Sequence, residues 1–184
     1  TYLNAEVVKE IKISGNQRVS DETVKVYGDI EINKNYNELD LNKILKNLNS
    51  TNFFEDIKIS LEKNILKVDL IEYPVINQLI LIGEPSKKYS EQIKKLMGLK
   101  EKQSFIKSFL SKDIELIKNL YSAIGYNSSK VEAKIKNIND RSVELVIEIE
   151  RGNKTKISSI SFTGDKKVRE RRLRDIIVSE EDKF

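Results

Sequence analysis

The sequence predicts an α+β fold made of tandem units, each a three-stranded mixed sheet covered by two helices. One observation is a repeated strand pattern that begins at Val8, Ile76 and Ile157. In each copy, apolar residues occupy positions 1, 4 and 6 and a glycine occupies position 8. A second observation is the order of the segments after each of the first two copies, which reads helix, helix, strand, strand. Each copy of the pattern therefore opens a small domain with one sheet.

The repeats divide the chain into three units. We expect the first over 6–73, the second over 74–152, and the N-terminal part of a third over 153–184. The third unit would lack its second helix and its closing strands, so its apolar residues would be exposed or covered by a neighbour. We expect association or disorder in that part of the chain.

The first unit should open with a strand and two helices. Apolar alternation predicts the strand over 8–14, and Ser20 is a suitable N-cap for a helix that runs to about Gly28. Asp40 is expected to cap the second helix. The buried stripe of this helix consists of Leu41, Ile44, Leu45 and Leu48.

Both units should close with a hairpin of two alternating strands. In the first unit, the segments 55–61 and 65–71 flank the polar turn 62–64. The second unit repeats the whole order, with strands over 76–82, 130–136 and 143–149 and helices over about 89–97 and 111–124.

The pairing rules then predict the sheet order. Strands joined by a tight turn are antiparallel neighbours, and the first strand of each unit needs a place beside one of them. We place the last strand at the centre, which gives the order first, last, middle. The segments 55–61 and 130–136 then each lie at an edge of a sheet.

An open edge either is guarded against aggregation by outward charges or binds an extended partner by strand addition. Both interpretations stay open at this point, since lysines and glutamates alternate along these segments. The edge positions that would contact such a partner are Asp56, Ile57, Lys58, Ile59 and Ser60 in the first unit, and Lys130, Val131, Glu132, Ala133, Lys134, Ile135 and Lys136 in the second.

The linkers between the units are too short for free coil, so we expect hinges of limited range. Pro74 fixes its own φ and biases Tyr73 toward an extended conformation, which stiffens the first junction. Arg151, Gly152 and Asn153 form a more permissive second junction. Pro74 and Gly152 are also ordinary punctuation between domains.

Composition excludes most familiar active sites. The 184 residues include no histidine and no cysteine, so the commonest general base, the soft metal ligands and thiol nucleophiles are missing. Adjacent acids such as Glu55 and Asp56 point to opposite faces of a strand. We expect no catalytic residues, no metal, no cofactor and no enzymatic activity. No apolar run is long enough to span a bilayer as a helix.

Charge is graded along the chain. Residues 6–73 hold 10 basic and 13 acidic residues, whereas residues 74–151 hold 14 and 10. The basic segment 166–174 is either the solvated face of a helix or a patch for an anionic ligand. A KH-like RNA-binding module shares the element order, but its GxxG phosphate loop does not occur in this sequence, and we expect no nucleic-acid partner.

The segment Gly15-Asn-Gln-Arg-Val-Ser-Asp-Glu-Thr-Val24 resembles the opening of the first POTRA domain of BamA-type proteins in the Omp85 superfamily. The segments 72–74 and 150–152 are similar to the family's domain junctions. The chain departs from the family at Gly83-Glu84-Pro85, where Gly-Asn-Lys is usual, and at Asn52, where glycine is usual.

The resemblance implies tandem POTRA-like units in the periplasm, as the soluble arm of a protein whose C-terminal part is an outer-membrane β-barrel. It implies unfolded outer-membrane β-barrel proteins and accessory assembly lipoproteins as partners, with membrane attachment only through that barrel. A POTRA region of a secretion transporter or of a division protein is the alternative. The match over residues 15–24 argues against it.

Overall fold

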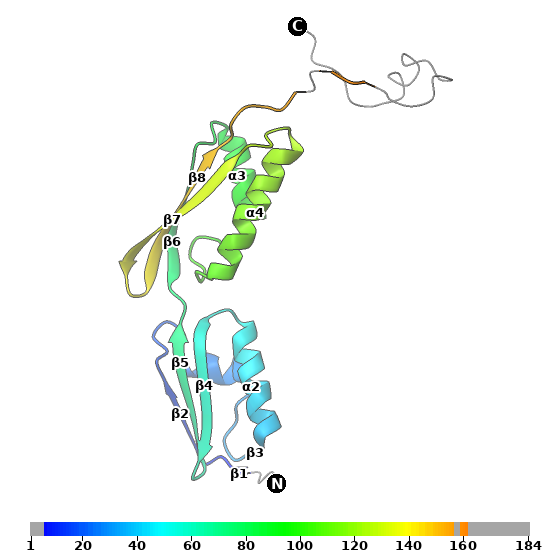
Figure 1. Ribbon diagram of the computed structural model, residues 1–184. Coiled ribbons are helices and arrows are strands. Elements are labelled where there is room, and N and C mark those ends of the chain that lie inside the picture. Colours follow the sequence, from blue (N-terminus) through cyan, green and yellow to red (C-terminus); the bar gives the residue numbers. More distant parts are fainter. Residues whose placement is uncertain (1–5, 157–158, 162–184) are drawn as a thin grey trace, which may run out of the picture.

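A computed structural model describes residues 6–156 and 159–161 and shows two sheets that follow one another along an elongated molecule (Figure 1). The helices lie on the same side of both sheets. The predicted α+β fold, with three-stranded mixed sheets, is confirmed. Most of the third unit expected over 153–184, including the basic segment 166–174, lies outside the described residues.

The first sheet confirms the predicted strand order. It consists of β2 (Glu10–Ser14), β4 (Phe54–Glu62) and β5 (Ile65–Glu72) in the order β2-β5-β4. β2 is parallel to β5 and β4 is antiparallel to it. The turn between β4 and β5 holds Lys63 and Asn64 at φ 51° and 65°, the left-handed geometry that suits a two-residue hairpin.

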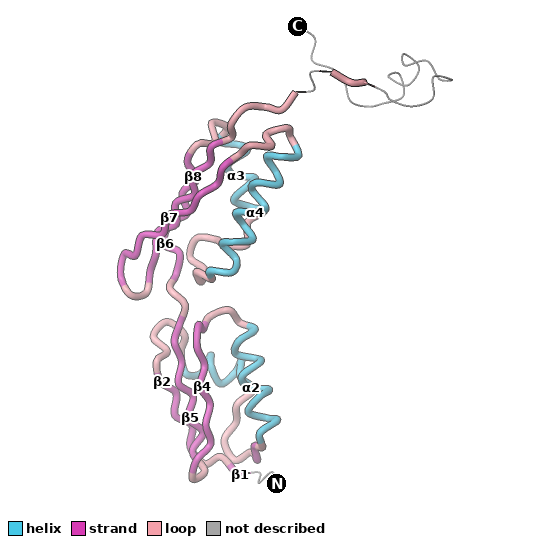
Figure 2. The backbone as a smooth tube through the Cα atoms, in the orientation of Figure 1, coloured by secondary structure: helices cyan, strands magenta, loops and turns pink. Residues whose placement is uncertain are grey.

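Two short strands of the first unit were not predicted. β1 (Glu6–Val7) pairs with β3 (Asn35–Tyr36) in a separate two-stranded sheet (Figure 2). Strands of two residues are too short to show an alternating pattern, so the sequence carries no periodic signal for them.

The first unit has two helices, α1 (Asp21–Gly28) and α2 (Glu38–Ser50). The predicted N-cap of α1 is present, since Ser20 Oγ accepts a hydrogen bond from the Thr23 N–H at 3.2 Å. The predicted N-cap of α2 is wrong: Asn37, not Asp40, caps this helix. Asp40 instead accepts the Asn37 N–H at 3.0 Å and so completes a capping box.

The second unit repeats the fold in a separate sheet. Its elements are β6 (Val75–Ile82), α3 (Lys87–Leu96), α4 (Lys107–Ala123), β7 (Lys130–Asn139) and β8 (Ser142–Glu150), with strand order β6-β8-β7. Helix α4 begins earlier than the predicted residue 111. The residue at its N-cap, Ile106, makes no side-chain capping bond, so the sequence offers no start signal there.

Each unit has its own hydrophobic core between the central strand and the helices. In the first core, Leu66 and Val68 of β5 are completely buried beneath Leu48 of α2. In the second, Leu145 of β8 lies in the same cluster as Ile117 of α4. The two outer strands of each sheet form its edges, and the candidate site lies along these edges.

Candidate binding edges and domain junction

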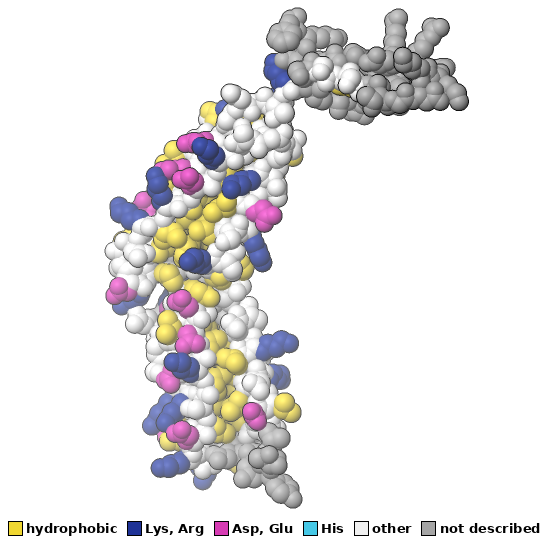
Figure 3. Space-filling view, viewed as in Figure 1, with side chains coloured by type: hydrophobic (Ala, Val, Ile, Leu, Met, Phe, Trp, Pro, Cys, Tyr) yellow, Lys and Arg dark blue, Asp and Glu magenta, His cyan; other side chains and the backbone are white. Residues whose placement is uncertain are grey.

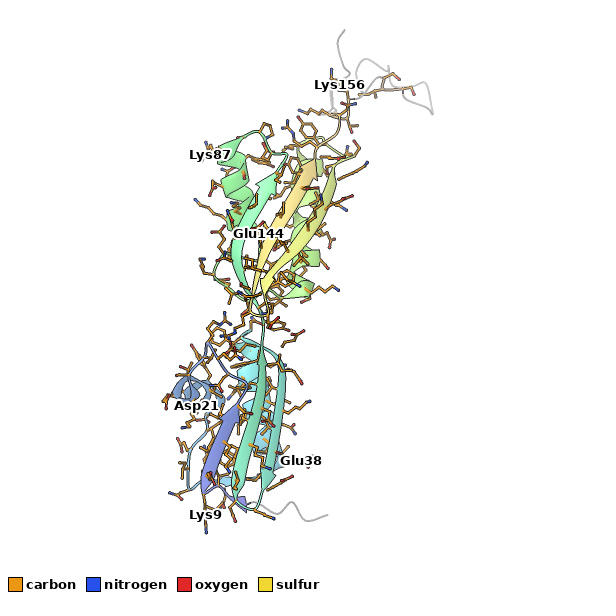
Figure 4. All side chains as sticks on the ribbon, turned by 90° about the vertical axis from the view of Figure 1, so that its left-hand side faces the viewer. Lys9, Asp21, Glu38, Lys87, Glu144 and Lys156 are labelled. Atoms are coloured by element: carbon orange, nitrogen blue, oxygen red, sulfur yellow. The ribbon has the colours of Figure 1, made fainter. Side chains whose placement is uncertain are left out.

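The strands β4 and β7 are the edges on one side of the molecule. Within the described part of the chain, β4 pairs only with β5 and β7 only with β8. Figure 4 looks onto the sheets and shows β4 (cyan) and β7 (yellow) on the same side. The structure thus places both predicted edge segments, 56–60 and 130–136, along one side.

The opposite edges of the two sheets are β2 and β6. Part of β6 is covered by the loop between α3 and α4: the Lys102 N–H donates to the Ile76 carbonyl at 2.7 Å, and the Glu101 carboxylate accepts the Leu79 N–H at 2.9 Å. β2 has 5 residues, whereas β4 has 9 and β7 has 10. The β4 and β7 edges are therefore the longer surfaces for an added strand.

Along β4, the inward side chains are incompletely covered. Ile57 and Ile59 pack against the first core but are half-buried, in contrast to the buried residues of β5. Lys58 and Ser60 alternate with them and are exposed. The Lys58 ammonium lies 3.7 Å from the Asp56 carboxylate, an exposed ion pair on the same strand. The edge thus combines open backbone with an apolar margin.

Along β7, the cover over the inward side chains decreases from one end to the other. Val131 is buried and Ala133 is half-buried, whereas Ile135 is 44% exposed. Figure 3 shows hydrophobic side chains gathered between this strand and α4, with charged residues on the other side of the strand. An amphipathic strand beside β7 could continue that apolar surface.

Two of the three outward lysines of β7 pair with the central strand. Lys134 Nζ lies 2.7 Å from Glu148 Oε1, and Lys130 Nζ lies 3.8 Å from Glu150 Oε2. The hydrogen bond from Lys134 to Glu148 raises the pKa of the lysine. These pairs cross the outer face of the sheet, while Glu132 and Lys136 are exposed on the same face.

The first junction is held from both sides. The Tyr73 N–H donates to the Phe53 carbonyl at 2.9 Å, and the Pro74 carbonyl accepts the Phe105 N–H at 2.7 Å. Tyr73 is thereby attached to the first unit and Pro74 to the second. The change from one unit to the next thus falls at the peptide bond between them.

Glu72, which precedes the predicted hinge, organises a loop far away in the sequence. Its carboxylate accepts the backbone N–H groups of Gln17 at 3.0 Å, Arg18 at 3.0 Å and Val19 at 2.9 Å. The segment 15–24 is recognisable in the sequence but its partner Glu72 is not, because no local pattern links residues so far apart. The Glu72 carboxylate thus joins the loop after β2 to the junction between the two units.

Arg18 extends from this loop to the second unit. Its guanidinium lies 5.8 Å from the centre of the Phe53 ring, and Nη2 lies 3.4 Å from Ser104 Oγ. Hollows of about 550 and 300 Å³ flank this contact and are lined by residues of both units. Arg18 therefore crosses the junction between them.

At the second junction, the chain after β8 is fastened to the loop that follows α4. The Arg151 guanidinium lies 5.4 Å from the centre of the Tyr126 ring, and the Thr155 N–H donates to the Gly125 carbonyl at 2.7 Å. Gly152 has φ 69°, the left-handed region that favours glycine. The chain that leaves β8 at Arg151, Gly152 and Asn153 thus runs beside the loop that follows α4.

The chemistry available in the described residues is that of backbone edges and surface charges. These residues contain no cluster of three or more side chains of the kinds that bind metals. None of the helices in the same part of the chain is both long and apolar enough to cross a membrane. Tandem α+β units with open sheet edges along one side define a modular protein of repeated small domains.

Comparison with known proteins assigns these tandem domains to a family. A POTRA family model described as "Surface antigen variable number repeat" matches residues 74–152, and a model described as "POTRA domain, FtsQ-type" matches residues 7–73. The chain belongs to the POTRA family and is the POTRA region of a BamA-type protein, as its sequence resemblance predicted.

The relatives cover both units. The outer membrane protein assembly factor BamA of Neorickettsia risticii is 27% identical over 181 residues, which is 98% of this chain and 24% of the relative. BamA of Neisseria meningitidis is also 27% identical, over 90% of this chain and 21% of the relative. The chain thus spans about a quarter of the length of these curated relatives.

A solved structure shares the fold. The N-terminal domain of Omp85 from the cyanobacterium Thermosynechococcus elongatus superposes with a TM-score of 0.53 at 13% identity. The match covers 97% of this chain and 78% of that structure.

Proposed function

We propose that residues 6–73 and 74–152 are two complete POTRA domains in the periplasmic arm of an outer-membrane protein assembly factor. In this proposal the arm binds unfolded β-barrel proteins by adding their strands to β4 and β7. The contacts are made by residues 56–60 and 130–136. The relatives that align over both domains are named as outer membrane protein assembly factors, which supports this class of client over a transport or division role.

The observation that carries the proposal is the open, half-covered edge that both domains present on one side. Strands of outer-membrane barrels alternate apolar and polar residues. A strand added beside β4 or β7 would place its apolar residues against the margin formed by Ile57, Ile59 and Ile135. Its polar residues would face the charged outer surface.

Recognition through the backbone explains how one arm would serve many clients. Main-chain hydrogen bonds make no demand on side-chain identity beyond alternation. Each such bond contributes a net of about 0.5–1.5 kcal/mol. Ordering a client residue costs about 1–2 kcal/mol, so each edge should bind weakly and release readily.

The same arm is proposed to hold accessory assembly lipoproteins and to articulate at Tyr73–Pro74 and at Arg151–Asn153. Its role in this proposal is to bind and transfer clients, without an enzymatic step. Attachment to the outer membrane would come from the remainder of a full-length protein.

The test is an amide NMR titration of the 184-residue chain with peptides copied from barrel strands. The proposal expects shifts concentrated at residues 56–60 and 130–136. Scrambled peptides of equal charge should shift these residues less, because they lack alternation. Peptides with N-methylated backbones should not shift them, because they lack the donors. Equal shifts with all three peptides, or shifts confined to the helices, would contradict strand addition.

A further inference from the structure

The second domain has an apolar hollow in its helix layer, apart from the sheet edges. It has a volume of about 440 Å³ and is lined by Tyr89, Gln92, Ile93, Lys95 and Leu96 of α3 and by Leu120 of α4. Figure 4 places Lys87, at the start of α3, on the β6 side of the domain and away from β7. The residues that line the hollow all belong to the two helices and none to β7, so the hollow is separate from the β7 edge.

The hollow exposes hydrophobic surface that the domain itself does not cover. Ile93 is buried at its base and Leu120 is half-buried, whereas Leu96 is 59% exposed. An exposed leucine beside a concave apolar surface is typical of a protein interaction site.

Helix α3 is rich in positive charge, and one of its lysines, Lys95, lines the hollow. It carries Lys87, Lys88, Lys94 and Lys95 and a single acidic residue, Glu91. Within the described part of the chain, none of these lysines forms an ion pair. The four lysines exceed the one acidic residue of the helix by three charges, so a partner with carboxylates would meet a net positive surface.

Helix stability does not account for the lysines at the start of α3. The first turn of a helix favours acidic residues because the N-terminus carries partial positive charge. Helices α1 and α2 follow this rule with two acidic residues each, whereas the first turns of α3 and α4 have none. Lys88, Gln92 and Lys95 follow one another at helical spacing and form a polar margin beside Leu96.

We propose that the hollow between α3 and α4 is the docking site for an acidic amphipathic helix of a partner protein. One apolar side chain of that helix would enter the hollow between Leu96 and Leu120. Its carboxylates would lie against Lys88 and Lys95. Concave shape favours an inserted side chain over a bilayer, since membrane surfaces bind protruding apolar ridges. The site is separate from the strand edges and does not depend on strand addition.

The test uses the full 184-residue chain and a designed peptide of about 18 residues, long enough to form a helix, with leucine at helical spacing and glutamate elsewhere. We expect saturable binding with a Kd below about 1 mM. Amide shifts should centre on Gln92, Ile93, Leu96 and Leu120. Leu96→Asp should weaken binding at least about ten-fold, and Lys95→Glu about three-fold with a reduced salt dependence.

Matched controls come from α2 of the first domain. Leu39 is 71% exposed and Lys46 is exposed, so Leu39→Asp and Lys46→Glu introduce the same changes elsewhere and should leave the Kd unchanged. The proposal is overturned if Leu96→Asp leaves the Kd unchanged or if Leu39→Asp weakens binding equally. Phosphatidylglycerol vesicles that bind through Leu96 where the peptide does not bind would assign the hollow to a membrane surface instead. A dimer that Leu96→Asp dissociates and the peptide does not disrupt would assign it to a second copy of the chain.

Discussion

Each domain places a glycine against the backbone of its central strand, and the two domains differ in the polar groups around that glycine. Gly15 directly follows β2 and Gly83 directly follows β6, with φ 82° and 93°. A Cβ atom at either position would lie 1.9 Å from a carbonyl oxygen of the central strand, that of Leu70 or of Ile149. This shared approach makes Glu72 and Arg151 equivalent in position, although their charges are opposite.

The difference follows from the number of backbone donors in the loop after each glycine. In the first domain, the N–H groups of residues 17–19 all point to the Glu72 carboxylate. The second loop is shorter, and Pro85 in it has no N–H to donate. Glu84 accepts the Ser86 N–H at 2.8 Å and also the hydroxyl of Tyr121. Arg151 therefore does not take the role that Glu72 has in the first domain, and its guanidinium lies over the Tyr126 ring instead.

The comparison shows what repetition of a fold requires. The close approach of the glycine recurs because the pairing of the strands fixes it. The residue two positions after the approached carbonyl differs, because the two loops leave different numbers of backbone N–H groups in need of an acceptor. As a consequence, the first domain attaches its loop to Glu72, the residue before the predicted hinge, and the second domain has no equivalent attachment at Arg151. Through Arg18, the same loop contacts the next domain.

The largest loss of stability should come from substitution of the two glycines that approach the central strands. Gly15→Ala and Gly83→Ala would each place a methyl group against a backbone carbonyl at a left-handed φ, and we expect each to destabilise its own domain by about 4 kcal/mol or more. Urea unfolding followed by amide signals from each domain measures this. Gly98→Ala is the control, because its new Cβ would meet nothing closer than 3.5 Å. Equal loss in both domains from one substitution would show that they unfold together.

Glu72→Ala should have the next largest effect. It removes the acceptor of three backbone N–H groups, with the Glu72 side chain 12% exposed, and we expect the first domain to lose about 3 kcal/mol. Glu72→Gln keeps one acceptor oxygen and should lose less. Arg151→Ala at the equivalent position should cost the second domain below about 1 kcal/mol, the range of a cation–π contact. Comparable losses from Glu72→Ala and Arg151→Ala would contradict the proposed difference between the domains.

Tyr121 should give the second domain a sensitivity to alkaline pH. Burial, followed by the hydrogen bond to Glu84, raises the pKa of Tyr121 above its ordinary value. The folded domain then keeps this proton where the unfolded chain loses it, so stability should fall as pH rises above about 10. Tyr121→Phe should cost about 1–2 kcal/mol at neutral pH and remove that part of the pH dependence. Unfolding curves at pH 8 to 11 for both proteins, expected to converge at the alkaline end, would check this.

The sequence predicts the framework of the fold better than its polar details. Alternation and tight turns were sufficient for the order β2-β5-β4 and β6-β8-β7, because a hairpin leaves few places for the first strand. The cap of α2 was misassigned because Asn37 and Asp40 both have capping side chains, and the choice depends on their reciprocal bonds. Glu72 could not be found, since its partners are more than 50 residues away and any acceptor would serve them.

The candidate edges were predictable for the same reason as the fold. Once the sheet order is known, β4 and β7 must be outermost. What the sequence could not show is how far their inward side chains are covered, because that depends on where α2 and α4 pack. The hollow between α3 and α4 was likewise beyond prediction, since Leu96 at helical spacing reads as a core residue and is 59% exposed in the structure.

The smallest effect on stability should come from Arg18, which joins the two domains. Its stacking on Phe53 is worth about 0.5–1 kcal/mol, and its bond to Ser104 is long at 3.4 Å. Arg18→Ala should therefore leave the unfolding of either domain almost unchanged. It should widen the range of orientations between the domains, because it removes a side chain that spans the junction.

Residual dipolar couplings measured separately for the two domains would detect this change as a larger difference between their alignment tensors. Arg18→Lys keeps the charge and loses the planar stacking, so it should behave like Arg18→Ala if stacking orients the guanidinium. Arg141→Ala, in the wall of the larger hollow, is the control. If Arg18→Ala leaves the couplings unchanged, Pro74 and the backbone hydrogen bonds on either side of it limit the junction. The loop that Glu72 holds then serves the stability of the first domain and not its orientation.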